Sequence, residues 1–183
     1  MKNAILRLLL ATIVGMPSLA LCQSFIFCPD IETPEKKGFD GVKVSIVFDD
    51  SRTYDKKRKE KCTKTEIFGE FANCIKRTYP NMQLTILDEK MFYEDPAKGS
   101  ITIKVKFRQY DATFYTGRYV ASTKYEVKIF DNRKEERVAE QTITGDGKQM
   151  NTLGSKSGKI ASNRSFKEAF DKFILMIDSI NIK

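Results

Sequence analysis

Five stretches of the chain have the residue pattern expected of strands. The clearest is 101–108, in which apolar residues at odd positions alternate with Thr, Lys and Arg at even positions. This period of two is typical of a strand that is buried on one side and faces solvent on the other. Further strands are predicted over 42–48, 82–87, 118–130 and 137–144, and the last two are expected to form a hairpin.

Two other stretches have helical spacing. The apolar residues of 65–79 fall on one stripe, and Thr63 and Glu66 in front of it have the spacing of a capping box. A second capping box, Ser165 with Glu168, predicts the start of a C-terminal helix with a stripe of Phe and Ile residues. The C-terminal stripe is wide enough to cover a sheet face.

The order strand, helix, three or four strands, helix predicts an α+β fold. We expect a two-layer sandwich, with a mostly antiparallel sheet of four or five strands and both amphipathic helices on one face. The Lys and Arg residues of 101–108 would lie on the opposite face. Residues 41–183 are expected to form this single domain, preceded by an extended leader over 23–40.

Residues 1–22 have the three-part layout of a secretory signal peptide. Lys2 and Arg7 precede an apolar stretch, and small residues follow it. The stretch is shorter than the roughly 20 residues that a membrane-spanning helix needs. We therefore expect export to the periplasm, with or without outer-membrane association, or alternatively to the extracellular space. No later segment of the sequence is predicted to span a membrane.

Cys22 suggests a lipid tether. The four residues 19–22, Leu-Ala-Leu-Cys, resemble the end of a bacterial lipoprotein signal, in which the Cys carries the lipid. Leu21 departs from that pattern, because Gly, Ala or Ser is usual there. Lipidation of Cys22 is thus a prediction that a mass spectrum would test.

Three cysteines follow the signal peptide, and an odd number in an exported chain predicts one disulfide and one free thiol. Cys62 and Cys74 lie twelve residues apart around one predicted helix, too far along its axis to bridge at about 1.5 Å per residue. Cys28 is therefore expected to pair with Cys62 or with Cys74.

The composition excludes many catalytic centres. The chain has no His, which rules out Ser-His-Asp and Cys-His catalysis, His-ligated zinc and haem with a proximal His. No cofactor is expected. Loss of residues 1–22 would leave 30 Lys and Arg against 24 Asp and Glu, a net charge of +6.

The segment 145–162 holds four Gly and three Ser, and we expect a mobile surface loop there. A Gly-rich loop between a strand and a helix is the setting of a phosphate-binding loop. The residues do not fit one, because three residues rather than four separate Gly154 from Gly158. Ile160 also stands where Ser or Thr would bind magnesium.

Carboxylates gather after the first two predicted strands: Asp49, Asp50, Asp88 and Glu89. If those strands are neighbours, the four side chains could bind magnesium or calcium. Glu126-Val127-Lys128, with Asp111 upstream, also has some likeness to the Asp…Glu-x-Lys pattern of metal-dependent nucleases. The alternative function is therefore a secreted metal-dependent hydrolase or nuclease.

Basic and aromatic residues supply candidate binding sites: Lys56, Lys57, Arg58 and Lys59 in a charged connection, Lys104, Lys106 and Arg108 on one strand, and Phe114 and Tyr115 near a hairpin tip. Clustered cations favour an anionic glycolipid, a wall polymer or an acidic protein surface. Export and the lack of an RNA-binding aromatic motif argue against nucleic acid.

The order of elements resembles small α+β accessory proteins of the Gram-negative envelope. The resemblance lies in the helix sequence FGEFANCIKR over 68–77, in the strands at 84–87, 101–105 and 125–129, and in the C-terminal Phe/Ile helix. Such proteins include the lipopolysaccharide-assembly lipoprotein, peptidoglycan-synthase activators and auxiliary lipoproteins of lipid-exporting transporters. The resemblance implies a non-enzymatic protein that binds an envelope protein or an anionic glycolipid or wall partner. A third hypothesis is an extracellular domain that binds a soluble ligand.

Overall fold

The structure is a computed structural model that describes residues 23–53, 58–94 and 101–180. The signal peptide and Cys22 lie outside these residues. The elements in chain order are β1 (Gln23–Ile26), β2 (Lys43–Asp50), β3 (Lys59–Glu60), α2 (Lys64–Thr78), β4 (Gln83–Ile86), the 3₁₀ helix η1 (Glu89–Tyr93), β5 (Ile101–Tyr115), β6 (Arg118–Asp131), β7 (Glu136–Met150) and α3 (Ser155–Asp178).

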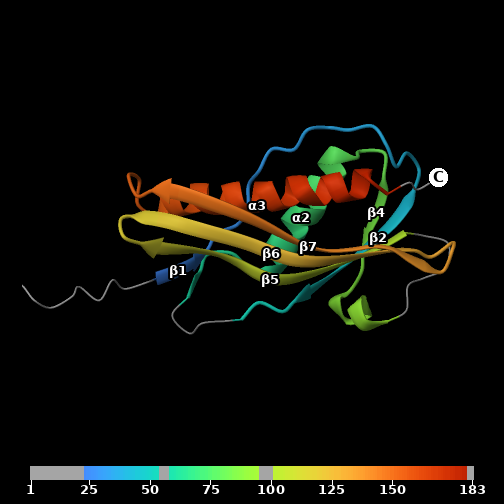
Figure 1. The fold of residues 1–183 in the computed structure, drawn as a ribbon, viewed down its shortest axis with the longest axis horizontal. Coiled ribbons are helices and arrows are strands. Elements are labelled where there is room, and N and C mark those ends of the chain that lie inside the picture. The colour runs from blue at the N-terminus through green and yellow to red at the C-terminus, as the bar shows by residue number, and fades with distance from the viewer. Residues whose placement is uncertain (1–22, 54–57, 95–100, 181–183) are drawn as a thin grey trace, which may run out of the picture.

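The sheet is mixed, so the α+β class is confirmed but the predicted mostly antiparallel sheet of four or five strands is wrong (Figure 1). Within the described residues it has seven strands. β5, β6 and β7 are antiparallel neighbours, whereas β2 runs parallel to both β4 and β5. The cause is the β2–α2–β4 connection, since a helical crossover returns the chain in the direction of the first strand.

Both helices pack on one face of the sheet, as the two apolar stripes predict. Phe71 of α2 is fully buried where they meet. Its ring lies edge-on to Phe107 and Tyr125 of the sheet, at 5.8 and 5.4 Å between centroids, and to Phe170 and Phe173 of α3, at 5.5 and 5.0 Å. Edge-to-face aromatic pairs of this kind stabilise a core beyond the area they bury.

The hairpin between β5 and β6 turns where the sequence predicts. Thr116 and Gly117 connect the strands with φ of 45° and 78°. Two central residues with positive φ form the tight turn that matches the twist of a hairpin. β6 ends at Asp131, one residue beyond the predicted end, and the backbone N–H of Lys134 donates to the Asp131 carbonyl in the next turn.

The predicted mobile loop over 145–162 is wrong, because most of this segment is strand and helix. β7 continues to Met150, and α3 begins at Ser155. A Cβ at Gly147 would lie 1.9 Å from the carbonyl oxygen of Ala161, and one at Gly145 would lie 2.1 Å from that of Ser165. These glycines therefore permit close packing of a helix on a strand rather than flexibility.

The predicted helix start at Ser165 is also wrong, since that residue lies in the middle of α3. Its hydroxyl shares a 2.9 Å hydrogen bond with Thr123 of β6 and donates to the Ser162 carbonyl. Glu168 instead accepts from Lys172 and from the backbone N–H of Asp146. The first predicted capping box is confirmed, with Thr63 and Glu66 bonded to each other at the start of α2.

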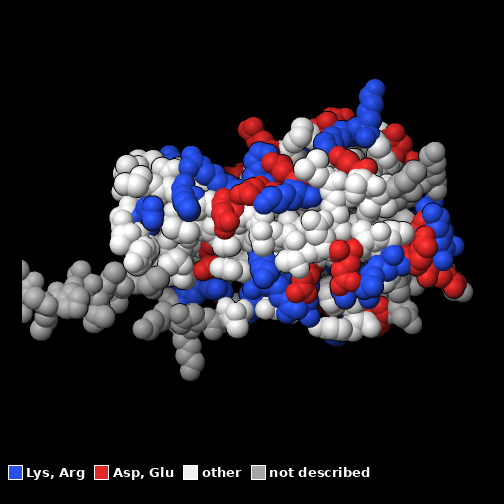
Figure 2. Space-filling model, viewed as in Figure 1, with Lys and Arg blue, Asp and Glu red and all other residues white. Residues whose placement is uncertain are grey.

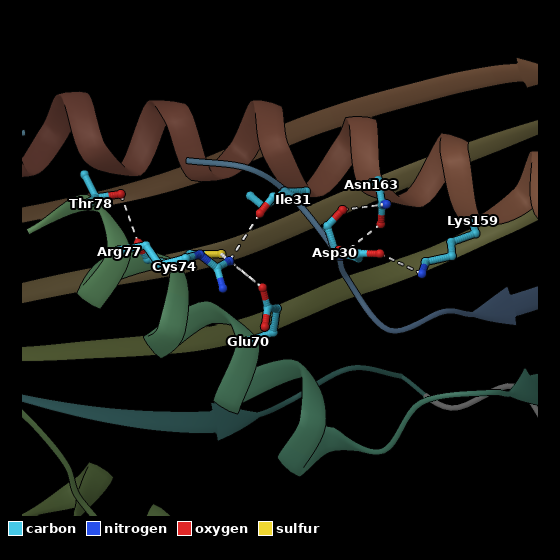
Figure 3. A network of polar contacts seen from close by, with 8 residues as sticks. All are labelled: Asp30, Ile31, Glu70, Cys74, Arg77, Thr78, Lys159 and Asn163. Atoms are coloured by element: carbon cyan, nitrogen blue, oxygen red, sulfur yellow. Dashed lines mark hydrogen bonds and ion pairs between the residues drawn. The ribbon is translucent and has the colours of Figure 1, made fainter. Parts of the chain in front are cut away.

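The segment after β1 is fixed to both helices (Figure 3). Arg77 of α2 donates to the Ile31 carbonyl at 3.2 Å. Asp30 pairs with Lys159 of α3 at 2.9 Å, and its carbonyl accepts from Asn163. Since β1 also pairs with β3 and β5, the start of the predicted 23–40 leader is part of the sheet.

Cys28 and Cys62 form a disulfide, with their Cα atoms 4.9 Å apart. This selects one of the two pairings that the spacing left open and leaves Cys74 as a buried free thiol. None of the helices in the described part of the chain is long and apolar enough to cross a membrane.

Candidate functional site

A pocket of about 380 Å³ lies on the face of the sheet opposite the helices. Its sides come from η1, β5 and β6, which brings together residues far apart in sequence. We call it the open-face pocket, and its lining residues are Phe92, Tyr93, Lys104, Lys106, Arg108, Glu126, Lys128 and Phe130. Three of the nine predicted binding residues, those of 101–108, are among them.

Two lysines of β5 lie over aromatic rings in this pocket. The Lys104 ammonium is 5.8 Å from the Phe92 centroid and 5.6 Å from that of Phe130, and it donates to the Glu94 carbonyl at 2.7 Å. Lys106 is 5.6 Å from the centroids of both Phe92 and Tyr93. Cation–π contacts hold the ammonium groups in place along the rings.

Arg108 stands at a bulge between β5 and β6, where the pairing register shifts. The shift turns both Arg108 and Gln109 outward while Phe107 and Tyr110 stay buried. Bulges commonly re-aim a side chain in this way. The guanidinium binds Glu126 with two hydrogen bonds, at 2.8 and 3.0 Å.

The Arg108–Glu126 contact changes the acidity of both groups. Hydrogen bonds from Arg108 lower the pKa of the Glu126 carboxyl, and the carboxylate raises the pKa of the guanidinium. A two-point contact between guanidinium and carboxylate also fixes the geometry of both side chains. On the same strand face, Lys128 pairs with Glu140 of β7 at 3.1 Å.

Asp49, at the end of β2, borders the pocket. Its carboxylate pairs with Lys106 at 3.0 Å and accepts hydrogen bonds from Ser51 and Tyr93. Burial alone would raise the pKa of Asp49, but hydrogen bonds from Ser51 and Lys106 outweigh it and the net shift is downward. Asp49 therefore orders the pocket wall as an anion.

The other three predicted metal-binding carboxylates also contact protein groups. β2 and β4 are neighbours, as a shared site would require. Asp50, however, forms a buried two-point ion pair with Arg52, and Glu89 pairs with Lys64 at 2.6 Å. Asp88 accepts from the backbone N–H of Lys90 and caps η1.

Metal-ligand geometry points elsewhere in the described residues. The group of three acidic or sulfur ligands whose atoms lie within 4.8 Å of one another is Cys28, Cys62 and Glu66. The two sulfurs are bonded to each other. A disulfide sulfur is not a thiolate and is a poor metal ligand.

The remaining predicted binding residues do not join this pocket. Lys56 and Lys57 lie outside the described residues. Arg58 lies just before β3 and Lys59 is its first residue, and β1 separates β3 from β5 in the sheet. Phe114 and Tyr115 lie at the turn between β5 and β6, at the far end of β5 from Ile101. The nine binding residues predicted from the sequence therefore belong to three separate regions of the molecule rather than to one site.

The sequence patterns did not predict the aromatic residues of the pocket. Phe92 and Tyr93 belong to η1, which has neither strand nor helix periodicity. Phe130 is the last residue of the predicted strand 118–130 and has no apolar neighbour at 126 or 128 to mark its face. A usable signal was the apolar triplet Met-Phe-Tyr at 91–93, which begins three residues after the capping Asp88 and lies between two strands.

No family model matches the sequence, and no curated protein matches it either. Solved structures do share its fold. Protein XCC0632 from Xanthomonas campestris, of the family DUF330, is 10% identical with a TM-score of 0.52, over 81% of this chain and 92% of that one. The hypothetical protein CT253 from Chlamydia trachomatis is 10% identical with a TM-score of 0.50, over 75% and 96%.

A bacterial lipoprotein is also among the similar structures. GNA1162 from Neisseria meningitidis is 8% identical with a TM-score of 0.38, over 76% of this chain and 99% of that one. At 10% identity, the likenesses to XCC0632 and CT253 show a fold and no activity. The particular envelope families that the sequence resembles stay a prediction.

Proposed function

We propose that the chain is an exported, non-enzymatic accessory protein of the bacterial envelope that binds a protein partner through the open-face pocket. The observation that carries this is the side-chain arrangement in the pocket. Cations lie over aromatic rings or against carboxylates, and Tyr93 at its edge is 76% exposed. Tyr and Arg are the residue types that most often dominate the energy of a protein interface.

The compartment rests on two observations. Residues 1–22 have the layout of a signal peptide, and Cys28 and Cys62 form a disulfide. Disulfides persist in exported proteins and are rare in the cytosol.

The charge balance favours a protein over a polyanion. Lys106, Arg108 and Lys128 each already contact a carboxylate of the sheet. A polymer of phosphates would have to displace these carboxylates, whereas a protein surface with mixed charges can bind around them. An anionic glycolipid is the other partner class that the cations allow.

A photoreactive amino acid at position 93, introduced in the native host, tests this function. We expect irradiation to give a discrete protein adduct from position 93. The matched control is position 175, because Leu175 is 65% exposed and lies on α3 behind the sheet. A lipid-sized adduct would replace the protein partner with a glycolipid, and equal adducts from both positions would contradict a site on this face.

A further inference from the structure

One end of the molecule, separate from the open-face pocket, is formed by two turns. The turn from β5 to β6 and the connection from β7 to α3 lie together there (Figure 1). The backbone N–H of Asn151 donates to the Gly117 carbonyl at 2.9 Å and joins the two. Phe27, at the end of β1, contacts Gly158 of α3 and packs this end from within.

Large apolar side chains are exposed at this end. Tyr115 is 51% exposed, Met150 is 63% exposed and Leu153 is 55% exposed. Tyr115 pairs with Arg118, which pairs in turn with Met150 across three adjacent strands, and Leu153 lies three residues further on. Three of the seven large exposed apolar residues in the described chain are thus close together.

The charge of this end is of one sign. Residues 147–167 contain five Lys or Arg and no Asp or Glu, and residues 112–125 contain two and none. Arg118, Lys148 and Lys156 are exposed and form no ion pair with any described residue. In Figure 2 the outermost part of this end is white and blue, whereas red and blue alternate over the rest of that face.

The described part of the chain begins at the same end. Gln23, the first residue of β1, pairs with Phe114, directly before Tyr115. Gln23 is therefore at the same end as the exposed apolar side chains. Any membrane attachment through the residues before Gln23 would bring this end to the bilayer first.

We propose that this end, defined by Tyr115, Met150, Leu153, Arg118, Lys148 and Lys156 and here called the hairpin end, contacts an anionic phospholipid bilayer. The three apolar side chains enter the interfacial region of the bilayer, and the three cations contact lipid phosphates. Tyr is enriched at membrane interfaces, and each Lys or Arg near an anionic surface adds to the attraction. A tethered protein would then hold the open-face pocket at a fixed orientation to the membrane.

Single tryptophans test the proposal, because the chain contains no Trp. Leu153→Trp and Leu175→Trp place the same probe at exposed positions near opposite ends of α3, in the complete chain. With vesicles that contain phosphatidylglycerol, we expect the emission of Leu153→Trp to shift to shorter wavelength and to be quenched by brominated lipid. The emission of Leu175→Trp should stay unchanged.

Insertion of residues 1–22 alone would also bring position 153 nearer to the bilayer than position 175. The charge variant described below keeps residues 1–22 and separates the two causes, because a shift that survives in it would come from those residues and would overturn the proposal. An unchanged Leu153→Trp emission, or equal shifts at both positions, would overturn the proposal. A second experiment tests whether the cations contribute to the contact. In vesicles of phosphatidylcholine alone, and in Leu153→Trp combined with Arg118→Gln, Lys148→Gln and Lys156→Gln, the shift should be largely lost. A shift of equal size in both kinds of vesicle would overturn the role of the cations.

Discussion

Gly147 and Gly145 decide how closely α3 approaches β7. We expect Gly147→Ala to lower the free energy of unfolding by about 3 kcal/mol or more, because its Cβ would lie 1.9 Å from the Ala161 carbonyl oxygen and the helix would have to move. Urea unfolding followed by circular dichroism measures the change.

Gly69 supplies the matched control. It lies within α2, and a Cβ there would have nothing within 4 Å. Gly69→Ala should leave stability unchanged or raise it by up to about 1 kcal/mol, through helix propensity alone. If Gly147→Ala behaved like Gly69→Ala, the close packing of α3 on β7 would be contradicted.

Cys74 is expected to be unreactive in the native protein. Its side chain is buried, and burial raises the pKa of the thiol to about 12, although the charge of Arg77 acts in the opposite direction. Since the thiolate is the reacting species, native protein from which residues 1–22, and with them Cys22, have been removed should not react at pH 8 with a thiol reagent such as iodoacetamide. One equivalent should react after denaturation, and rapid reaction without denaturant would be the contrary result.

The alternation of apolar and polar residues predicted correctly which side chains of a strand are buried. The alternation in 101–108 correctly placed Ile103, Val105 and Phe107 in the core. The patterns failed where small residues pack closely. Glycines such as Gly145 and Gly147 occur both in flexible loops and in close helix–strand contacts, and the sequence does not distinguish the two. Likewise Arg108 and Gln109 both face outward only because of a bulge, which composition does not encode.

The Cys28–Cys62 disulfide ties β1 to the segment before α2. The loop that it closes has a sequence separation of 34 residues. For a loop of that size, chain entropy predicts a loss of about 3–4 kcal/mol when the bond is removed. We expect the double variant Cys28→Ser, Cys62→Ser to show this loss in urea unfolding under oxidising conditions.

Reduction of the wild-type protein provides a control for the serine side chains, and it should lower the unfolding midpoint as much as the double variant does. A double variant as stable as the oxidised protein would show that the bond does not constrain the fold.

The sequence predicted whether each long element is a helix or a strand, but not which strands pair with one another. The sequence located α2, β2, β4 and the start of β5, and it predicted two helices on one face. β1, β3 and η1 were missed because they are short and lack a period of their own. The parallel pairing of β2 was missed although the order strand, helix, strand favours it.

At the scale of the whole molecule, we expect stability to fall on acidification. Several carboxyl groups have a lowered pKa in the folded state because of hydrogen bonds and cations: Asp49, Glu126, Asp131, Glu168 and Asp178. A group with a lower pKa in the folded than in the unfolded state stabilises the fold above its unfolded pKa of roughly 4. That contribution is lost as pH falls through the folded pKa.

Urea unfolding midpoints measured from about pH 6 to about pH 2, the range in which these carboxyl groups titrate, show this loss. Several of these groups are partly exposed, so solvent screening keeps each contribution small. Glu126→Gln should make the decline shallower, because that variant has one carboxyl group fewer to protonate. A midpoint that rises on acidification would contradict the sign of these shifts.

The most direct test of a binding site on the open face is the crosslinking yield from position 93 in a charge-swapped protein. Arg108→Glu with Glu126→Arg keeps an ion pair at 108 and 126 and exchanges the positions of its charges. Partner surfaces that match the original charges would be repelled, so we predict a fall in adduct yield of about tenfold or more at unchanged protein level and unfolding midpoint. An unchanged yield would contradict the claim that a partner binds the open-face pocket.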